Sequence, residues 1–282
     1  MDKQFFSERY EALGGNTEAV RPKRAIRLNT LRGPASDILR KLTAKEVTLE
    51  KIPFLENGYY VESRFSMGAT PEYLLGEYQL QEAASQLPAE ALAPTEKDLV
   101  LDMCAAPGAK TTQLAQLMDN KGLIIALDLK KERIPSLTNN LERMGVTNTM
   151  VYQMNALEVG KLNLKFTKIL LDAPCSGNYV GEPGWFERRD LEGIRRNAEL
   201  QRKLLKAAVD VLEDGGTIVY STCSLEPEED EETIRYAVEE LGLKIVPLDK
   251  EGIIGDSVLE GTRRLWPHKT GTQGFFLAKL KK

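Results

Sequence analysis

The stretch Asp98-Leu-Val-Leu-Asp102-Met-Cys-Ala-Ala-Pro-Gly-Ala-Lys-Thr-Thr-Gln-Leu-Ala-Gln-Leu117 decides the fold of this chain of 282 residues. Apolar residues lead into Asp102, and a turn of small residues follows. Beyond the turn, the spacing places Leu114, Leu117 and Met118 on one face of a helix. The stretch therefore predicts a strand, a tight turn and a helix.

The turn has the properties of a ligand cradle. The small residues Ala105, Ala106 and Gly108 let the backbone approach a ligand, and free amides at the helix start attract polar groups. An ordinary turn of an α/β sheet explains these residues equally well. A phosphate-binding loop would need glycine where Cys104 and Ala109 stand, and the dinucleotide fingerprint GxGxxG is absent. The turn thus fits a ligand with an adenosine end and no phosphate.

A second strand strengthens this interpretation. The segment 122–128 ends in the carboxylate of Asp128, at the distance from the turn where such sheets hold ribose hydroxyls. S-adenosylmethionine fits, because it carries an adenosine, a sulfonium and an amino acid without pyrophosphate. We therefore expect S-adenosylmethionine as the cofactor.

Composition limits the class of protein. Apolar residues make up 42% of the chain, which is ample for a packed core. No apolar run is long enough to span a membrane and no secretion leader is evident, so we expect a cytoplasmic protein without membrane contact. The three cysteines, Cys104, Cys175 and Cys223, are too few and too widely spaced for a disulfide framework or a zinc site, and we expect no metal.

The charge distribution leaves room for a nucleic-acid partner. The net charge of −4 argues weakly against a protein that coats nucleic acid. Much of the negative charge falls in 226–232, which we expect to be a solvated helix start. Two local basic clusters remain as candidate phosphate contacts, although scattered surface arginines would explain them as well: Arg21, Lys23, Arg24, Arg27 and Arg32, and then Arg263, Arg264, His268 and Lys269.

The pattern along the chain predicts two domains. Residues 1–72 read as a small α+β domain that is a candidate for RNA binding, and residues 73–282 read as the larger domain. We expect a helix over 73–87, ended by Pro88. The larger domain should be an α/β, Rossmann-like doubly wound unit with a seven-stranded, mostly parallel sheet, whose strands are 99–102, 122–128, 149–153, 168–172, 216–221, 243–246 and 274–280.

Two predicted strand ends carry thiols. Asp172-Ala-Pro-Cys175-Ser-Gly follows the fourth strand, and Ser221-Thr-Cys223-Ser follows the fifth, so both thiols should face one cleft. Alternatively, the two cysteines are simply small, buried hydrophobic side chains. Beside a methyl donor, a thiolate that adds to ring carbon 6 of a pyrimidine makes carbon 5 nucleophilic, and a second group then removes the carbon 5 proton. An aspartate can hydrogen-bond ring nitrogen 3 if one of the two carries a proton as charge develops there.

These motifs, in this order, resemble the signature of the Nop/Sun family of RNA cytosine-5 methyltransferases. The resemblance covers nearly the whole chain, including Arg27-Leu-Asn-Thr-Leu31 and Tyr78-Gln-Leu-Gln-Glu-Ala-Ala-Ser85 on the N-terminal side. On the C-terminal side, Arg264-Leu-Trp-Pro-His268 and Gly274-Phe-Phe-Leu-Ala278 continue it. The resemblance implies a class I S-adenosylmethionine-dependent methyltransferase fold and an RNA substrate.

The resemblance also assigns roles residue by residue. It implies Cys223 as the nucleophile, Cys175 as the residue for proton removal and product release, and Asp172 as the residue that orients the base near the donor methyl. It implies Asp128 on the ribose. The remaining donor contacts would come from Cys104, Ala105, Ala106, Pro107, Gly108, Ala109, Lys110, Arg133 at the polar end and Asn155 at the adenine edge, with Asp172 close by.

This chain departs from the family pattern at three places. Ala109 replaces a common glycine, and Asn155 stands where the family usually has aspartate. The loop 178–186 lacks the arginine pattern of bacterial ribosomal members and resembles archaeal tRNA-modifying ones. We therefore expect tRNA as the substrate, read at single-stranded or opened positions.

Three alternatives stay open. The same chemistry could act on ribosomal RNA. A DNA cytosine-5 methyltransferase would place its nucleophile in a Pro-Cys after the fourth strand, where Cys175 stands. A non-catalytic RNA-binding assembly factor predicts loss of Cys223, Cys175 or Asp172, and all three are present. The sequence identifies no helper protein.

Overall fold

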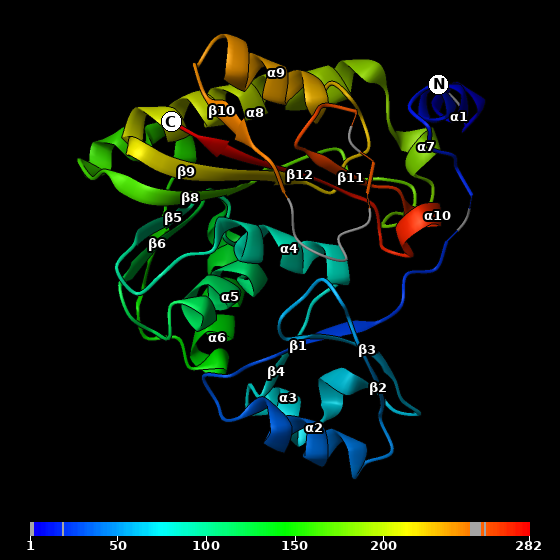
Figure 1. The fold of residues 1–282 in the computed structure, drawn as a ribbon, viewed down its shortest axis with the longest axis vertical. Helices are drawn as coiled ribbons and strands as arrows, with labels where there is room; N and C mark the ends of the chain where they lie inside the picture. Colours follow the sequence, from blue (N-terminus) through cyan, green and yellow to red (C-terminus); the bar gives the residue numbers. More distant parts are fainter. Residues whose placement is uncertain (1–2, 19, 249–254, 257) are drawn as a thin grey trace.

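The computed structural model describes residues 3–18, 20–248, 255–256 and 258–282. The chain forms a larger α/β unit with helices on both faces of its sheet, and a smaller sheet unit beside it (Figure 1). In the described part of the chain, no helix is both long and apolar enough to cross a membrane.

The large sheet has the strand order β10-β12-β9-β8-β5-β6-β7, with β11 paired to β12. Strand β12 runs antiparallel to its neighbours, whereas the pairs among β5 to β9 are parallel. The predicted seven-stranded, mostly parallel sheet is confirmed, and β11 adds an eighth strand. The strands are β5 (Leu99–Asp102), β6 (Leu123–Asp128), β7 (Thr149–Gln153), β8 (Phe166–Asp172), β9 (Leu212–Thr222), β10 (Lys244–Val246), β11 (Arg263–Leu265) and β12 (Phe275–Lys281).

Alternate residues of the central strands supply the two cores. Leu101 and Leu171 pack with helix α8 (Leu191–Val211), while Val100 and Leu170 pack with helices α4 (Ala83–Leu92) and α5 (Ala109–Leu117) on the other face. The remaining helical elements of this unit are η2 (Lys131–Arg133), α6 (Ile134–Met144), η3 (Ala156–Leu162), α7 (Trp185–Arg188), α9 (Glu231–Glu239) and α10 (Pro267–Thr270).

The small unit is a four-stranded antiparallel sheet in the order β2-β3-β1-β4. Ile26, Ile38, Leu42 and Tyr78 form its core. Because β4 pairs with β1, this sheet continues past residue 72. Its elements are β1 (Ala25–Leu28), α2 (Ala35–Thr43), β2 (Thr48–Lys51), β3 (Gly58–Glu62), η1 (Met67–Ala69), α3 (Pro71–Leu74) and β4 (Tyr78–Leu80).

The predicted helix over 73–87 is wrong. The chain turns at Gly76, whose φ is 73° and where an added Cβ would lie 1.9 Å from the Arg143 carbonyl oxygen. Strand β4 follows, and α4 then begins where the Glu82 side chain accepts hydrogen bonds from the Ala84 and Ser85 amides. Pro88 lies inside α4 rather than ending it. Within 73–87, only the end of α3 and the residues from Ala83 onward are helical.

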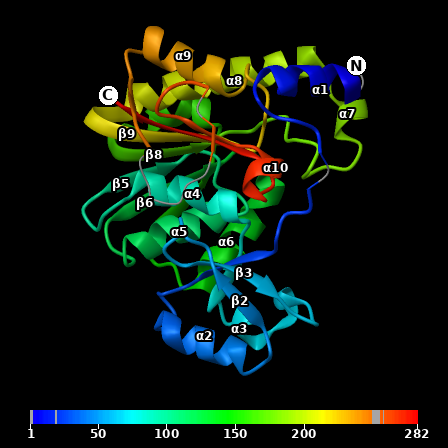
Figure 2. The same cartoon turned by 45° about the vertical axis from the view of Figure 1, so that its right-hand side comes forward.

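The first helix, α1 (Lys3–Ala12), packs on the larger unit although it precedes the small sheet in sequence. Its buried residues Phe6 and Tyr10 join a cluster with Trp185, Ile194 and Trp266, and the ribbon views place α1 beside α7 (Figure 2). The N-terminal segment therefore belongs physically to both units.

Candidate active site

The turn after β5 ends at Gly108, which precedes α5 with a φ of 105°. A side chain there would be strained and would lie 3.0 Å from Leu137 Cδ1. Residues 104–107, Ala109 and Lys110 line a small hollow together with Asp102 and Asp172. The structure thus brings the predicted donor-binding turn and the predicted catalytic carboxylate to one place.

Asp102 contributes a buried oxygen to this hollow. Its Oδ2 accepts a hydrogen bond of 2.8 Å from Thr111 Oγ1, whereas its buried Oδ1 has no hydrogen-bond partner in the described part of the chain. Burial raises the pKa of Asp102 to about 7. An unpaired buried carboxylate oxygen fits a ligand that supplies a cationic donor, as the amino acid end of S-adenosylmethionine does.

Asp128 lies beside the same turn and is held by backbone amides. Its Oδ2 accepts from the Ala106 amide at 3.1 Å, and its Oδ1 accepts from the Lys130 amide at 3.0 Å. Arg133 Nη1 lies 3.3 Å from Asp128 Oδ2, and the same guanidinium donates to the Ala106 carbonyl. Arg133 therefore forms an ion pair with the Asp128 carboxylate. Asn155 follows the next strand, where its side chain accepts from the Leu157 amide at 3.1 Å and caps η3.

The two predicted catalytic thiols meet. Cys175 Sγ and Cys223 Sγ lie 3.1 Å apart, just past the carboxyl ends of the adjacent strands β8 and β9. Because one thiol donates to the other and Lys110 is near, the pKa of Cys223 is lowered. The shared hydrogen bond and then burial raise the pKa of Cys175. Burial also raises the pKa of the Cys104 thiol. Cys223 is therefore the thiol best placed to act as a thiolate.

A carboxylate and an ammonium complete this cluster. Lys110 Nζ donates to Asp172 Oδ2 at 2.7 Å, and Ser221 Oγ donates to Asp172 Oδ1 at 2.7 Å. Lys110 Nζ also lies 5.7 Å from the centre of the Phe275 ring. The site therefore combines two thiols, an oriented carboxylate and a positive charge.

Two residues that sequence reasoning did not predict support the thiols. Asn178 Nδ2 donates to the Cys223 carbonyl at 2.7 Å, and the Glu229 carboxylate accepts from the amide of Ser176. Their positions within three to six residues of the thiols along the chain were the available signals. No periodic pattern marks them, because neither lies on the repeating face of an element.

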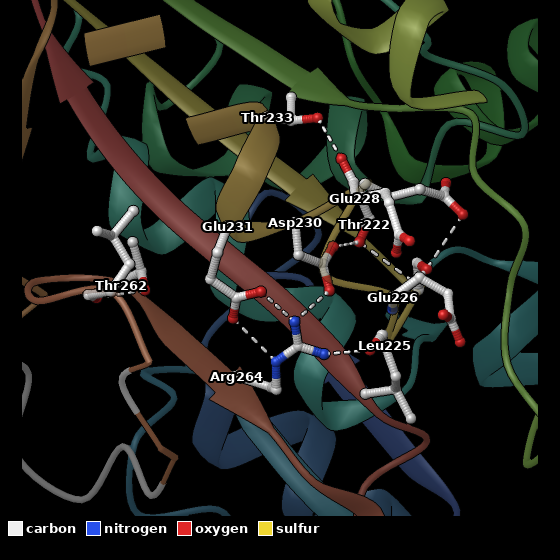
Figure 3. A network of polar contacts seen from close by, with 12 residues as sticks. Thr222, Leu225, Glu226, Glu228, Asp230, Glu231, Thr233, Thr262 and Arg264 are labelled. Carbon is white, nitrogen blue, oxygen red and sulfur yellow. Dashed lines mark hydrogen bonds and ion pairs between the residues drawn. The ribbon is translucent and has the colours of Figure 1, made fainter. Parts of the chain in front are cut away.

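The acidic segment 226–232 is mostly not solvated, so this prediction is wrong. The side chains of Glu226, Glu229 and Asp230 are fully buried. Arg264, predicted as a phosphate contact, is also fully buried and donates to Glu231 and to the Leu225 carbonyl (Figure 3). Buried charges of opposite sign satisfy one another there, which a linear count of charges cannot reveal.

Part of the N-terminal basic cluster is also internal. Arg27 is buried and donates to the Ala109 carbonyl at 2.9 Å and to Thr112 Oγ1 at 2.8 Å. Burial lowers the pKa of Arg27 to about 9. Arg32 donates to carbonyls at the end of α6. Arg24, in contrast, is exposed, so only part of the predicted patch can face a partner.

A large groove opens between the small sheet and the loop after β8. Lys23, Arg24 and Arg64 line one side together with the exposed ring of Phe65, and Val180 belongs to the loop that follows the Cys175 motif. The groove therefore places a basic surface beside the loop that follows Cys175. In the described ranges, no cluster of three or more histidine, cysteine, aspartate or glutamate side chains is arranged for a metal ion.

The fold and the site define a class of protein, the Rossmann-like S-adenosylmethionine-dependent methyltransferases. A family model described as 16S rRNA methyltransferase RsmB/F matches residues 89–281, and one described as the N-terminal domain of 16S rRNA methyltransferase RsmF matches residues 3–83. The chain belongs to the RsmB/F methyltransferase family, which confirms the resemblance to the Nop/Sun enzymes.

The names of its relatives refer to more than one kind of RNA substrate. The human 28S rRNA (cytosine(4447)-C(5))-methyltransferase is 41% identical, over 100% of this chain and 37% of its own length. The Pyrococcus horikoshii tRNA (cytosine(72)-C(5))-methyltransferase is 42% identical, over 73% of this chain and 53% of its own. This chain therefore spans only about two fifths to one half of these relatives.

Solved structures agree with the fold. A methyltransferase homolog protein from Pyrococcus horikoshii has a TM-score of 0.84 at 38% identity, with 93% of this chain and 87% of that chain covered. NSun6 from Pyrococcus horikoshii with SFG has a TM-score of 0.85 at 28% identity, with 94% and 91% covered. Both units of the fold are therefore shared with these proteins.

Proposed function

We propose that this chain is an S-adenosylmethionine-dependent RNA methyltransferase that forms 5-methylcytosine through a covalent cysteine adduct. The approach of Cys175 Sγ and Cys223 Sγ to 3.1 Å, beside Asp172, is the observation that carries this proposal. One pyrimidine ring can meet both sulfurs only if they share one cleft.

The Cys223 thiolate adds to carbon 6 of cytosine, which breaks the double bond between carbons 5 and 6 and makes carbon 5 nucleophilic. Bound S-adenosylmethionine supplies an electrophilic methyl group, which carbon 5 takes up as the methyl–sulfur bond breaks. Cys175, once it has released its own thiol proton to solvent, then takes up the carbon 5 proton. The electron pair of that C–H bond restores the double bond, and the bond from Cys223 to carbon 6 breaks. Its lowered pKa supports Cys223 as the nucleophile.

Asp172 and Lys110 orient the base and balance its charge. The carboxylate of Asp172 is held on one side by Ser221 and on the other by Lys110, so its position is fixed before the base arrives. A fixed carboxylate at the ring edge can receive a hydrogen bond from the exocyclic amine, and from ring nitrogen 3 once that nitrogen carries a proton. The ammonium of Lys110 offsets the negative charge that the thiolate and Asp172 bring to one site.

The donor would lie along the turn from Cys104 to Lys110. The unpaired Oδ1 of Asp102 would receive the amino group of the donor, and Asp128 would receive the ribose hydroxyls. Arg133 now lies across Asp128, so ribose binding requires this guanidinium to move aside. Asn155 remains a candidate for the adenine edge.

The RNA would occupy the basic groove beside the small sheet. The cations of Lys23, Arg24 and Arg64 match phosphate groups, and the exposed ring of Phe65 offers a stacking surface for an unpaired base. The loop containing Val180 then leads from this groove toward the thiol pair. The target cytosine must be unpaired or extruded for attack at carbon 6.

We propose tRNA as the substrate on the strength of the loop 178–186, which resembles that of archaeal tRNA-modifying members. Ribosomal RNA is the second candidate, because the human relative named for 28S rRNA matches the whole chain. Both candidates use the same site and the same chemistry.

Bisulfite sequencing of total RNA incubated with S-adenosylmethionine and the purified protein tests the activity and the substrate together. We expect new protected cytosines in tRNA with the wild-type chain and none with Cys223→Ala. Protected sites confined to ribosomal RNA would identify ribosomal RNA, not tRNA, as the substrate. Protected sites found only in a DNA control would identify DNA as the substrate. No protection in any nucleic acid would refute the activity.

A further inference from the structure

A single buried carboxylate connects the two thiol-bearing loops. Glu229 Oε1 accepts from the hydroxyls of Ser176 and Ser224, the latter at 3.2 Å. The Ser176 amide also donates to Glu229, at 3.1 Å to Oε2. Ser176 directly follows Cys175, and Ser224 directly follows Cys223. Glu229 therefore joins the two loops immediately beside the sulfurs.

A third element fixes this carboxylate. Gln201, on α8, donates from Nε2 to Glu229 Oε2 at 2.7 Å and to the Pro174 carbonyl at 2.9 Å. Pro174 directly precedes Cys175, so the loop of Cys175 is held on both sides of the thiol. These hydrogen bonds, which we call the tether, connect helix α8 through Glu229 to the loops of both cysteines.

Glu229 differs from its acidic neighbours in the kind of partner it has. Asp230 and Glu231 face the Arg264 guanidinium (Figure 3). Glu226 faces Arg9 and the Tyr10 hydroxyl. Glu229 instead receives hydrogen bonds from neutral donors of Ser176, Ser224 and Gln201. No cation among the described residues pairs with Glu229. A fully buried carboxylate in this situation is costly unless several donors satisfy it, so its position needs a reason beyond charge balance.

We propose that Glu229 is a positioning residue that sets the spacing and orientation of Cys175 and Cys223. The proposal rests on the proposed function, in which one cytosine must meet the attacking sulfur and the proton-removing group in turn. Both steps depend on sub-ångström placement of the two sulfurs. A carboxylate suits this task because it accepts several hydrogen bonds at once, whereas an amide of the same shape has only one accepting oxygen.

The first test measures the sulfurs without any RNA. The oxidant diamide takes up both thiol hydrogens and becomes a hydrazine while Cys175 and Cys223 join in a disulfide, so its rate reports how readily the sulfurs meet. Iodoacetamide labelling of Cys223 across pH reports the thiolate population independently. Glu229→Gln keeps the side-chain shape and removes one acceptor and the charge. Glu226→Gln is the matched control, since it is equally buried in the same segment and its side chain bonds to neither serine.

In Glu229→Gln, we expect the ratio of the disulfide-formation rate to the Cys223 labelling rate to fall about tenfold or more. The negative charge of Glu229 raises the pKa of Cys223, so the same variant should label faster at a given pH below that pKa. A role in packing alone would not produce this opposite pair of changes. The control should match the wild type in both rates.

The second test measures methyl transfer to total tRNA. Glu229→Gln should lower kcat about tenfold or more and leave KM unchanged, because the tether acts on the reacting groups and not on RNA binding. If the wild-type chain does not methylate RNA, the proposed function fails, whereas the diamide and labelling rates still decide the role of Glu229.

Two results would overturn the proposal: a wild-type disulfide rate in Glu229→Gln, or an equal loss of rate in Glu226→Gln. Should Glu229→Gln fail to fold, the double variant Ser176→Ala with Ser224→Ala removes the two hydroxyl donors and leaves the carboxylate in place. It should also slow disulfide formation, and an unchanged rate there would equally refute the tether.

Discussion

Replacing Arg264 with methionine should be among the most destabilising single substitutions in this protein. The Arg264 side chain has no exposed surface, and it faces two buried carboxylates and one carbonyl. Its Nε lies 3.0 Å from Glu231 Oε1, and its Nη2 lies 3.2 Å from Asp230 Oδ2. Methionine fills most of the volume but leaves both acids buried without their cation.

The expected cost follows from this geometry. Removing one partner of a buried ion pair costs about 3–5 kcal/mol, because the other charge stays desolvated. For a chain of this size, that loss lowers the melting temperature by about 6–20 °C. Burial already raises the pKa of Asp230, so loss of Arg264 favours its neutral form further. A carboxyl whose folded pKa is raised destabilises the fold as pH rises through that pKa. The deficit of Arg264→Met should therefore shrink as the pH falls.

Urea unfolding followed by circular dichroism measures this cost, at neutral and at mildly acidic pH. Arg196→Met is the matched control, because Arg196 and its partner Glu192 form an exposed pair on α8 and such pairs contribute about 0–1 kcal/mol. A loss below about 1 kcal/mol for Arg264→Met, or a deficit that grows in acid, would refute the reasoning.

Four further predictions concern the site. Cys223→Ala should abolish methyl transfer, and Cys175→Ala should accumulate a covalent protein–RNA adduct on a denaturing gel; the reverse pattern would exchange their roles. The pKa of Asp102 in the folded state is raised to about 7, so Asp102 favours the fold most when it is protonated, and this stability is lost as pH rises through 7. Asp102→Asn should therefore flatten the dependence of the melting temperature on pH in that range. An unchanged dependence would contradict the raised pKa. Asp128→Ala should weaken S-adenosylmethionine binding about tenfold to hundredfold by calorimetry, and undiminished affinity would place the ribose elsewhere. Arg24→Glu should raise KM for RNA at constant kcat and reduce the salt dependence of binding, and no change in either would remove Arg24 from the RNA face.

Local patterns accounted well for the sheet and for the contents of the cleft. Apolar runs that end at Asp102, Asp128 and Asp172 predicted the strands, and parallel strands bring their carboxyl ends to one edge. The meeting of Cys175 and Cys223 followed from that rule alone. The same local reading failed over 73–87, because a turn at Gly76 and pairing with β1 outweigh a helical spacing of apolar residues.

Charged residues were the main source of error. Arg27 and Arg264 counted as surface cations, and the acids from Glu226 to Glu232 counted as solvated. All of them except Glu228 and the exposed Glu232 are nearly or fully withdrawn from solvent. Whether a charge is buried depends on partners far away in the chain, such as Arg9 for Glu226 at a distance of 217 residues. No periodicity carries that information.

By itself, the sequence determined the strand–turn–helix start of the sheet, its mostly parallel order and the thiols and carboxylates at its carboxyl edge, because these depend on residue type and on spacing within one element. Only the tertiary structure decided which charges are buried. It also decided that the small unit and the loop after β8 line one groove, and that Glu229 joins the two cysteine loops. Those properties arise from contacts between residues tens to hundreds of positions apart, and such contacts exist only once the chain has packed.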